Sequence, residues 1–194
     1  MTIDCIEKII GNIGYDCSRE GRAKAGLETR AVILNKSDLD LTAVTSSGSV
    51  VTNITLESGA TGYYCDWILK QGNNTAAFVA GENTAPIFNH SFLARIHGTG
   101  AQDAERAREL GNGEFEIVTQ TKWKGTDNVE AYKVFGFDSG MKMSELTYSA
   151  NENDGSMLFT LSSVENGGGE TYPFMIYNEG SYAANKARFD ALFA

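Results

Sequence analysis

The stretch IFNHSFLARIHGTGAQDAERARELGNGEFEIVTQTKW, residues 87–123, predicts a strand, a short helix and a second strand. In its first part, Phe92 and Ala94 share one face, while Leu93 and Arg95 share the other. Such period-two alternation is typical of a β-strand whose two faces have different surroundings. The stretch decides the fold because it holds the one interior helix signal in a chain that otherwise predicts strands.

A helix is predicted over about residues 99–111. Ala104, Ala107 and Leu110 recur at a spacing of three, which places them on one helix face. Thr99, followed by a glutamine three residues later, fits a capping box at the helix start. Small residues on the inward face would allow this helix to lie close against a sheet.

The rest of the chain has the composition of a β protein. Its 194 residues include 21 Gly but only 2 Pro, and Gly supplies the positive φ that hairpin turns need. Asp154-Gly155 is a hairpin signal of this kind. Near the C-terminus, Ser181 can cap a last helix, on which Phe189 and Phe193 share a face with Tyr182. That face must pack on its own sheet or on a neighbouring subunit.

We therefore predict a mainly β fold, a β-sandwich or barrel, with one short flanking α-helix (about 99–111) and a C-terminal helix. The chain is expected to form a single domain of residues 1–194. An N-terminal arm (about 1–26) and a C-terminal arm (about 178–194) extend from it.

No pattern in the chain predicts catalysis. The net charge is −9, which argues against ordinary nucleic-acid binding, since that requires Lys and Arg to displace counterions from phosphates. Three widely spaced cysteines, Cys5, Cys17 and Cys65, form neither a disulfide framework nor a zinc motif. No stretch approaches the ~20 apolar residues of a membrane span. We expect no catalytic, metal or cofactor site, no cofactor and no membrane contact, and we predict that the chain is not an enzyme.

Two weak signals are better explained by structure than by chemistry. Gly98-Thr-Gly100 follows a strand and opens a helix, but it lacks the third glycine of a dinucleotide fingerprint. His90 and His97 lie seven residues apart on one predicted strand, too far to bind one metal ion together. We interpret them as histidines on the surface of a strand.

The second half of the chain carries a predicted strand at Gly113–Val118, then a strand and turn at Tyr132–Gly140. Their order and spacing resemble those of phage major tail tube proteins. The strand Gly113–Val118 is similar to a strand of that family, and Tyr132–Gly140 resembles its next strand and turn. An acidic-Gly hairpin, Glu152–Gly155, and a return strand, Met157–Leu161, follow in the family's order. The resemblance covers residues from about Phe88 to the C-terminus and extends to the first half only in the order of elements.

This resemblance implies a virion structural protein, a tail tube subunit that forms hexameric rings stacked into the conduit for DNA ejection. The implied partners are further copies of the chain and other tail proteins, such as the tape measure and the terminator, while DNA passes through the lumen without specific binding. The chain would be synthesised in the host cytoplasm and end in the virion tail. An acidic balance suits such a lumen, since six copies would carry about −54 per ring.

Assembly predicts that apolar side chains are left uncovered in a single chain. The candidate inter-subunit contacts lie in the loop after residue 36 and in the C-terminal arm; they are Leu39, Leu41, Phe189, Leu192 and Phe193. Two alternatives stay open at this point. One is a carbohydrate- or surface-binding β-sandwich module that uses Tyr63, Tyr64, Trp67 and Trp123. The other is a different tail component, such as a terminator, or the tube of a bacterial injection system.

Overall fold

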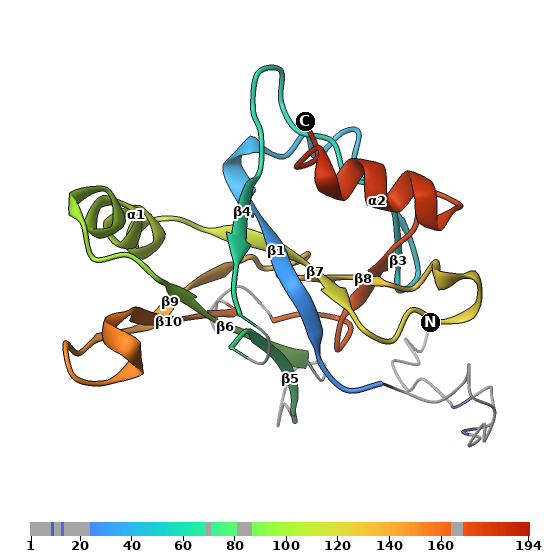
Figure 1. Ribbon diagram of the computed structural model, residues 1–194. Coiled ribbons are helices and arrows are strands. Elements are labelled where there is room, and N and C mark those ends of the chain that lie inside the picture. The colour runs from blue at the N-terminus through green and yellow to red at the C-terminus, as the bar shows by residue number, and fades with distance from the viewer. Residues whose placement is uncertain (1–8, 10–12, 14–23, 69–70, 81–86, 164–168) are drawn as a thin grey trace.

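The computed structural model describes residues 9, 13, 24–68, 71–80, 87–163 and 169–194 (Figure 1). The predicted N-terminal arm thus lies almost wholly outside the described residues. In chain order, the strands and helices are β1 (Leu27–Asn35), β2 (Thr45–Ser47), β3 (Val50–Asn53), β4 (Tyr63–Asp66), β5 (Asn73–Val79), β6 (Ile87–Ile96), α1 (Ala101–Asn112), β7 (Phe115–Thr121), β8 (Tyr132–Phe135), β9 (Met141–Tyr148), β10 (Met157–Ser163), β11 (Met175–Tyr177) and α2 (Tyr182–Asp190). The predicted mainly β fold with one interior and one C-terminal helix is confirmed.

The sheet is mixed and branches at β7. Its main path runs β2-β3-β11-β8-β7-β9-β10-β6-β5, and β1 pairs with both β7 and β4. The β7 strand meets β9 through a single residue pair, Phe115 with Met141, and the sheet bends into two wings there. One wing contains β2, β3, β11, β8, β7, β1 and β4, and the other contains β9, β10, β6 and β5. The pairs are antiparallel apart from β3 with β11. The path does not close on itself, so the described chain is an open, folded sheet and not a barrel.

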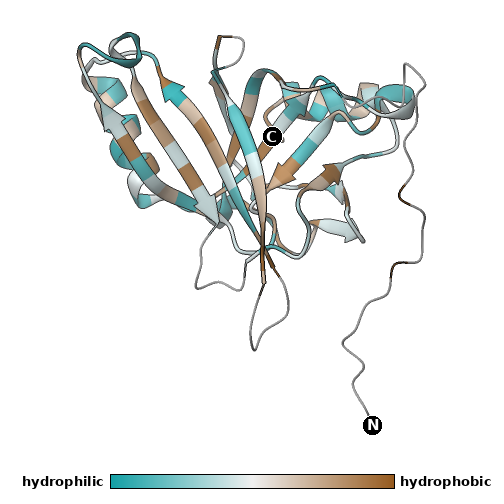
Figure 2. Cartoon of the chain, turned by 90° about the horizontal axis from the view of Figure 1, so that it is seen from below, coloured by the Kyte–Doolittle hydropathy of each residue, from teal (hydrophilic) through white to brown (hydrophobic). Residues whose placement is uncertain are grey.

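The two wings enclose one core between them and a second core lies under α2. Figure 2 shows the wings as a V, with the helices on its outer sides. Strand β1 contributes to both cores, because Ala31 and Ile33 face the other wing while Val32 and Leu34 face α2. All four are buried, as expected for a strand covered on both faces. The alternation along β1 therefore separates two cores from each other, and not a core from solvent.

Helix α1 lies on the flank of the sheet, against β9 (Figure 1). It matches the predicted range, but its N-cap is Gly100 and not Thr99, so the predicted capping box is wrong. The Asp103 carboxylate reaches back and accepts a hydrogen bond from the Gly100 N–H, at 2.9 Å. No side chain of α1 is buried: Ala107 and Leu110 are half-buried, and Ala104 is exposed. Helix α1 therefore packs only loosely against the sheet.

The hairpin predicted at Asp154-Gly155 is present between β9 and β10. Asn153, Asp154 and Gly155 all adopt positive φ, between 54° and 71°. Asn, Asp and Gly are the residues that tolerate this conformation best. The turn places the two strands in register, with Met157 opposite Tyr148.

Candidate functional site

Most of the predicted inter-subunit contacts are buried inside the chain. Leu39, Phe189 and Phe193 are at most 5% exposed, and all three belong to the core under α2. The expectation that a single chain leaves them uncovered is wrong. Leu192 is half-buried against the same core, and Leu41 is 70% exposed. A role in subunit contacts stays a prediction, and Leu41 is the member of the set that is free to make one.

Helix α2 packs on its own sheet because its aromatic face meets aromatic strand residues. The Phe189 ring lies 5.0 Å from the Tyr132 ring, and Phe193 lies 5.1 Å from Tyr177. Asn185 is fully buried and accepts a hydrogen bond from the Glu179 N–H, at 2.8 Å. The Ser181 hydroxyl accepts from the Ala184 N–H, so the predicted N-cap is confirmed. The C-terminal arm is therefore part of the fold.

A buried polar cluster holds the turn between β8 and β9. His90 is 1% exposed, so its interpretation as a surface histidine is wrong. Its Nδ1 accepts from the Gly136 N–H at 3.1 Å, which leaves Nε2 protonated to donate to the Tyr172 carbonyl at 2.9 Å. Burial lowers the pKa of His90, against the opposing charge of Glu170. With both ring nitrogens committed, His90 has a structural role.

Glu170 completes this cluster from the other side of the turn. It is 2% exposed, and its carboxylate accepts from the N–H groups of Asp138 and Ser139, each at 3.0 Å. The Ser139 hydroxyl donates to it as well, at 2.8 Å. These three hydrogen-bond donors replace the water that the carboxylate loses on burial. This cluster fixes the turn between β8 and β9.

Glu116 is a buried carboxylate that lacks a hydrogen-bond partner for one of its oxygens among the described residues. It lies on β7, is 1% exposed, and its Oε1 has no hydrogen-bond partner among the described residues. The Lys36 ammonium stands 3.6 Å from Oε2 but is also bonded to the carbonyls of Gly136 and Phe137. Burial raises the pKa of Glu116 to about 7, because the nearby Lys36 charge only partly offsets desolvation. The sequence pattern held no signal for this residue.

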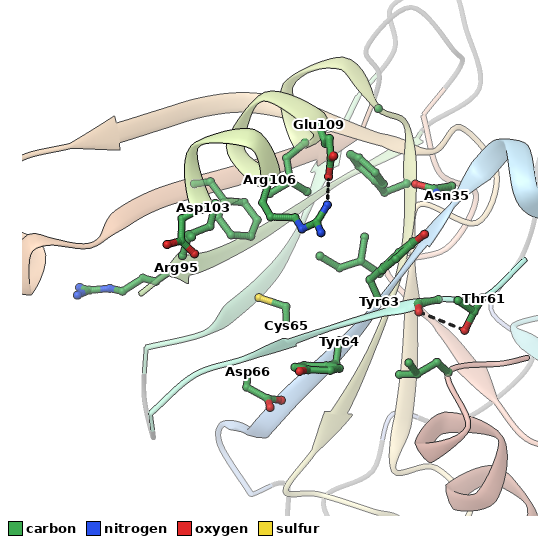
Figure 3. A pocket seen from close by; sticks show the side chains of 18 residues that line it. Asn35, Thr61, Tyr63, Tyr64, Cys65, Asp66, Arg95, Asp103, Arg106 and Glu109 are labelled. Atoms are coloured by element: carbon green, nitrogen blue, oxygen red, sulfur yellow. Dashed lines mark hydrogen bonds and ion pairs between the residues drawn. The ribbon is translucent and has the colours of Figure 1, made fainter. Parts of the chain in front are cut away.

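A groove of about 870 Å³ opens between β4, α1 and the ends of β6 and β10 (Figure 3); we call it the α1 groove. Apolar side chains of both wings and of the helix line it: Ile33, Ile96, Leu110, Phe115 and Phe159. Polar side chains surround this apolar lining, and Figure 3 shows Arg106 and Glu109 paired above it, at 2.6 Å. Asp66 is likewise held by Arg30, with two bonds of 2.6 and 2.8 Å.

The chemistry of the α1 groove favours contact over catalysis. Cys65 points into the groove in Figure 3, but burial raises the pKa of its thiol to about 12, so the nucleophilic thiolate is scarce at neutral pH. Among the described residues, no group of three or more His, Cys, Asp or Glu side chains could hold a metal ion. An apolar lining with a paired, nearly neutral rim suits a protein surface better than a charged ligand.

Three strands leave a sheet edge open. Within the described part of the chain, β2, β4 and β5 each pair on one side only. Strand β5 carries Phe78, which is 61% exposed, and β4 borders the α1 groove. Ile68 and Tyr148 are further exposed apolar side chains that sequence reasoning did not single out. Unpaired edges with apolar side chains are templates for pairing with another chain.

The aromatic platform considered for a carbohydrate-binding module is only partly exposed. Tyr63 and Tyr64 are 56% and 61% exposed on β4. Trp67 is 5% exposed and packs on Phe92 in the core between the wings, at 5.9 Å between ring centroids. Trp123 is half-buried. The four rings therefore do not form one sugar-stacking surface.

Comparison with known proteins yields no relative. No protein-family model, no curated protein and no solved structure matches this chain. In the described residues, no helix is both long enough and apolar enough to span a membrane. Function must therefore be argued from the fold, the edges and the grooves.

Proposed function

We propose that the chain is a virion structural protein, a tail tube subunit that assembles into hexameric rings which stack into a conduit for DNA. The observation that carries this proposal is the open sheet with single-sided edges at β2, β4 and β5. Ring formation would pair or cover these edges. It would also cover Leu41 and Phe78, which are exposed in the single chain.

The interior of the fold supports assembly by a preformed subunit. Helix α2 and the turn held by His90 and Glu170 are fixed within the chain, so the subunit does not need a neighbour to complete its cores. The α1 groove adds an apolar surface with paired rim charges, which suits a contact between copies. A net charge of −9 suits a conduit that DNA passes without adhering. A bacterial injection-system tube would use the same features.

The proposal is tested by placing a charge on an open edge. Light scattering and sedimentation over a range of concentrations should show the wild-type chain growing beyond a monomer. Phe78→Lys on β5 should shift this growth to higher concentration, because a lysine on an edge strand opposes strand pairing. Ala187→Lys is the matched control, since it adds the same charge at an exposed site on α2. A wild-type chain that stays monomeric at every concentration would exclude the proposal.

A further inference from the structure

The space between the two wings has a second mouth, at the opposite end of β1 from the α1 groove. It is a groove of about 620 Å³, which we call the Lys133 groove. Gly26 and Leu27, at the start of β1, line it, whereas Ile33 and Asn35 line the α1 groove. A hydrogen bond of 2.9 Å from Asn74 to Thr119 joins the wings at this end.

The lining of the Lys133 groove is apolar and aromatic with positive charge. Trp123, Phe135 and Phe174 contribute rings, and Lys24 and Lys133 contribute ammonium groups. No Asp or Glu is among the described residues that line it. This is unusual for a chain with 25 acidic and 16 basic residues. The two grooves therefore differ in kind, because acidic and basic side chains both line the α1 groove.

Among the described residues, Lys133 has no oxygen partner in this mouth. Its ammonium lies 3.6 Å from the centre of the Phe174 ring and 5.5 Å from that of Trp123. Neither a salt bridge nor a hydrogen bond to Lys133 is present among the described residues, and the Trp123 indole N–H is likewise unpartnered there. Burial lowers the pKa of Lys133 to about 8, because the charge of Glu130 only partly offsets desolvation. An ammonium held on aromatic rings without a carboxylate is incompletely compensated.

We propose that the Lys133 groove binds a small amphipathic anion, an aromatic or acyl group that carries a carboxylate, sulfonate or phosphate. The volume lies within the range of about 300–1,000 Å³ that is typical of small-molecule sites, which are mostly apolar with a few placed polar groups. The anionic group would bind the Lys133 ammonium, and the apolar part would lie against the aromatic lining. The proposal does not rest on tube assembly, because a single chain supplies all the lining residues.

Fluorescence titration with anilinonaphthalene sulfonate, an aromatic sulfonate, tests the site directly. The wild-type chain should bind it saturably at one site. N-phenylnaphthylamine, a related ring system without the sulfonate, should bind more weakly. Lys133→Met keeps the length and apolar stem of the side chain but should weaken sulfonate binding about tenfold, the loss of one charge-assisted contact. Lys133→Arg should retain binding, because the charge is kept. Lys142→Met on β9 is the matched control and should bind as the wild type does.

The pH profile gives a readout that needs no variant. Sulfonate affinity should fall as pH rises through about 8, where Lys133 loses its proton. Lys24, which lines the mouth, and Glu130, whose charge acts on Lys133, are both kept in Lys133→Met, so this variant should flatten the profile. Equal binding of the neutral ring system, undiminished binding by Lys133→Met, or no saturable binding would each overturn the proposal.

Discussion

Glu116→Gln should stabilise the protein at alkaline pH and leave it nearly unchanged at acid pH. The carboxyl group is buried, one of its oxygens has no partner, and its pKa is raised from 4.5 to about 7. A carboxyl whose pKa is higher in the folded state gives stability that is fully present below the unfolded pKa. This stability is lost as pH rises through the folded pKa. The window therefore runs from about pH 4.5 to 7.

The magnitude follows from the size of the shift. At about 1.4 kcal/mol for each pKa unit, ionising Glu116 in the folded state costs about 3 kcal/mol by pH 8. Glutamine has the shape of the protonated acid and cannot ionise. With a urea m-value of about 2 kcal/mol/M, the unfolding midpoint of the variant should lie about 1.5 M urea above that of the wild type at pH 8. At pH 4.5 the two midpoints should nearly coincide.

Urea unfolding of both proteins at several pH values measures this difference. Other groups that titrate, His90 among them, contribute equally to both proteins and cancel. Glu114→Gln is the control, because Glu114 is half-exposed and pairs with Lys142 at 3.2 Å. Its effect should stay below about 1 kcal/mol at every pH. A wild type that is more stable than Glu116→Gln at pH 8 would refute the reasoning, since it would mean that attraction to Lys36 outweighs burial.

Four further changes have expected outcomes. Phe189→Ala should cost about 3–5 kcal/mol in urea unfolding, because it empties the core under α2; a loss below 1 kcal/mol would mean that the helix is not docked. Gly136→Ala should destabilise by at least about 1 kcal/mol, since φ is +75° and a Cβ would stand 2.6 Å from Met141, and an unchanged midpoint would contradict this. Below about pH 6.5 the unfolded chain binds a proton that buried His90 resists, so the wild type loses stability as pH falls. His90→Gln should remove this part of the loss. Thermal melts from pH 7 to 5 would test it, and an unaltered pH slope would count against it. Leu41→Asp should reduce assembly in light scattering while it changes the monomer's unfolding free energy by less than about 0.5 kcal/mol, and undiminished assembly would remove Leu41 from the contact.

Local patterns in the sequence predicted the elements well where short-range physics decides them. The alternation in β6 and the Asp154-Gly155 turn could both be predicted, because strand period and turn conformation depend on neighbouring residues. The helix after residue 99 could also be predicted, although its start is set by the Asp103 carboxylate, which accepts a hydrogen bond from the Gly100 N–H. In each case the deciding contact lies within a few positions along the chain.

Burial of polar and apolar side chains could not be predicted, because it depends on partners far away in sequence. His90 is held by groups 46 and 82 positions further along the chain, which a strand pattern cannot reveal. Leu39 and Phe189 were predicted to be exposed in a single chain, because the pattern cannot say whether the partner of an apolar side chain is the same chain or another. The Lys133 groove combines residues from β5, β7, β8 and the segment before β11, so only the tertiary fold assembles it.

The most direct test of the proposed function is negative-stain electron microscopy of the purified, concentrated protein. Assembly as a tail tube subunit predicts rings whose averaged end views have six-fold symmetry, together with stacked rings or tubes in side view. Particles no larger than a single chain of 21.0 kDa in every field would contradict the proposed function. That outcome would not count against the Lys133 groove, because a single chain supplies all of its lining residues.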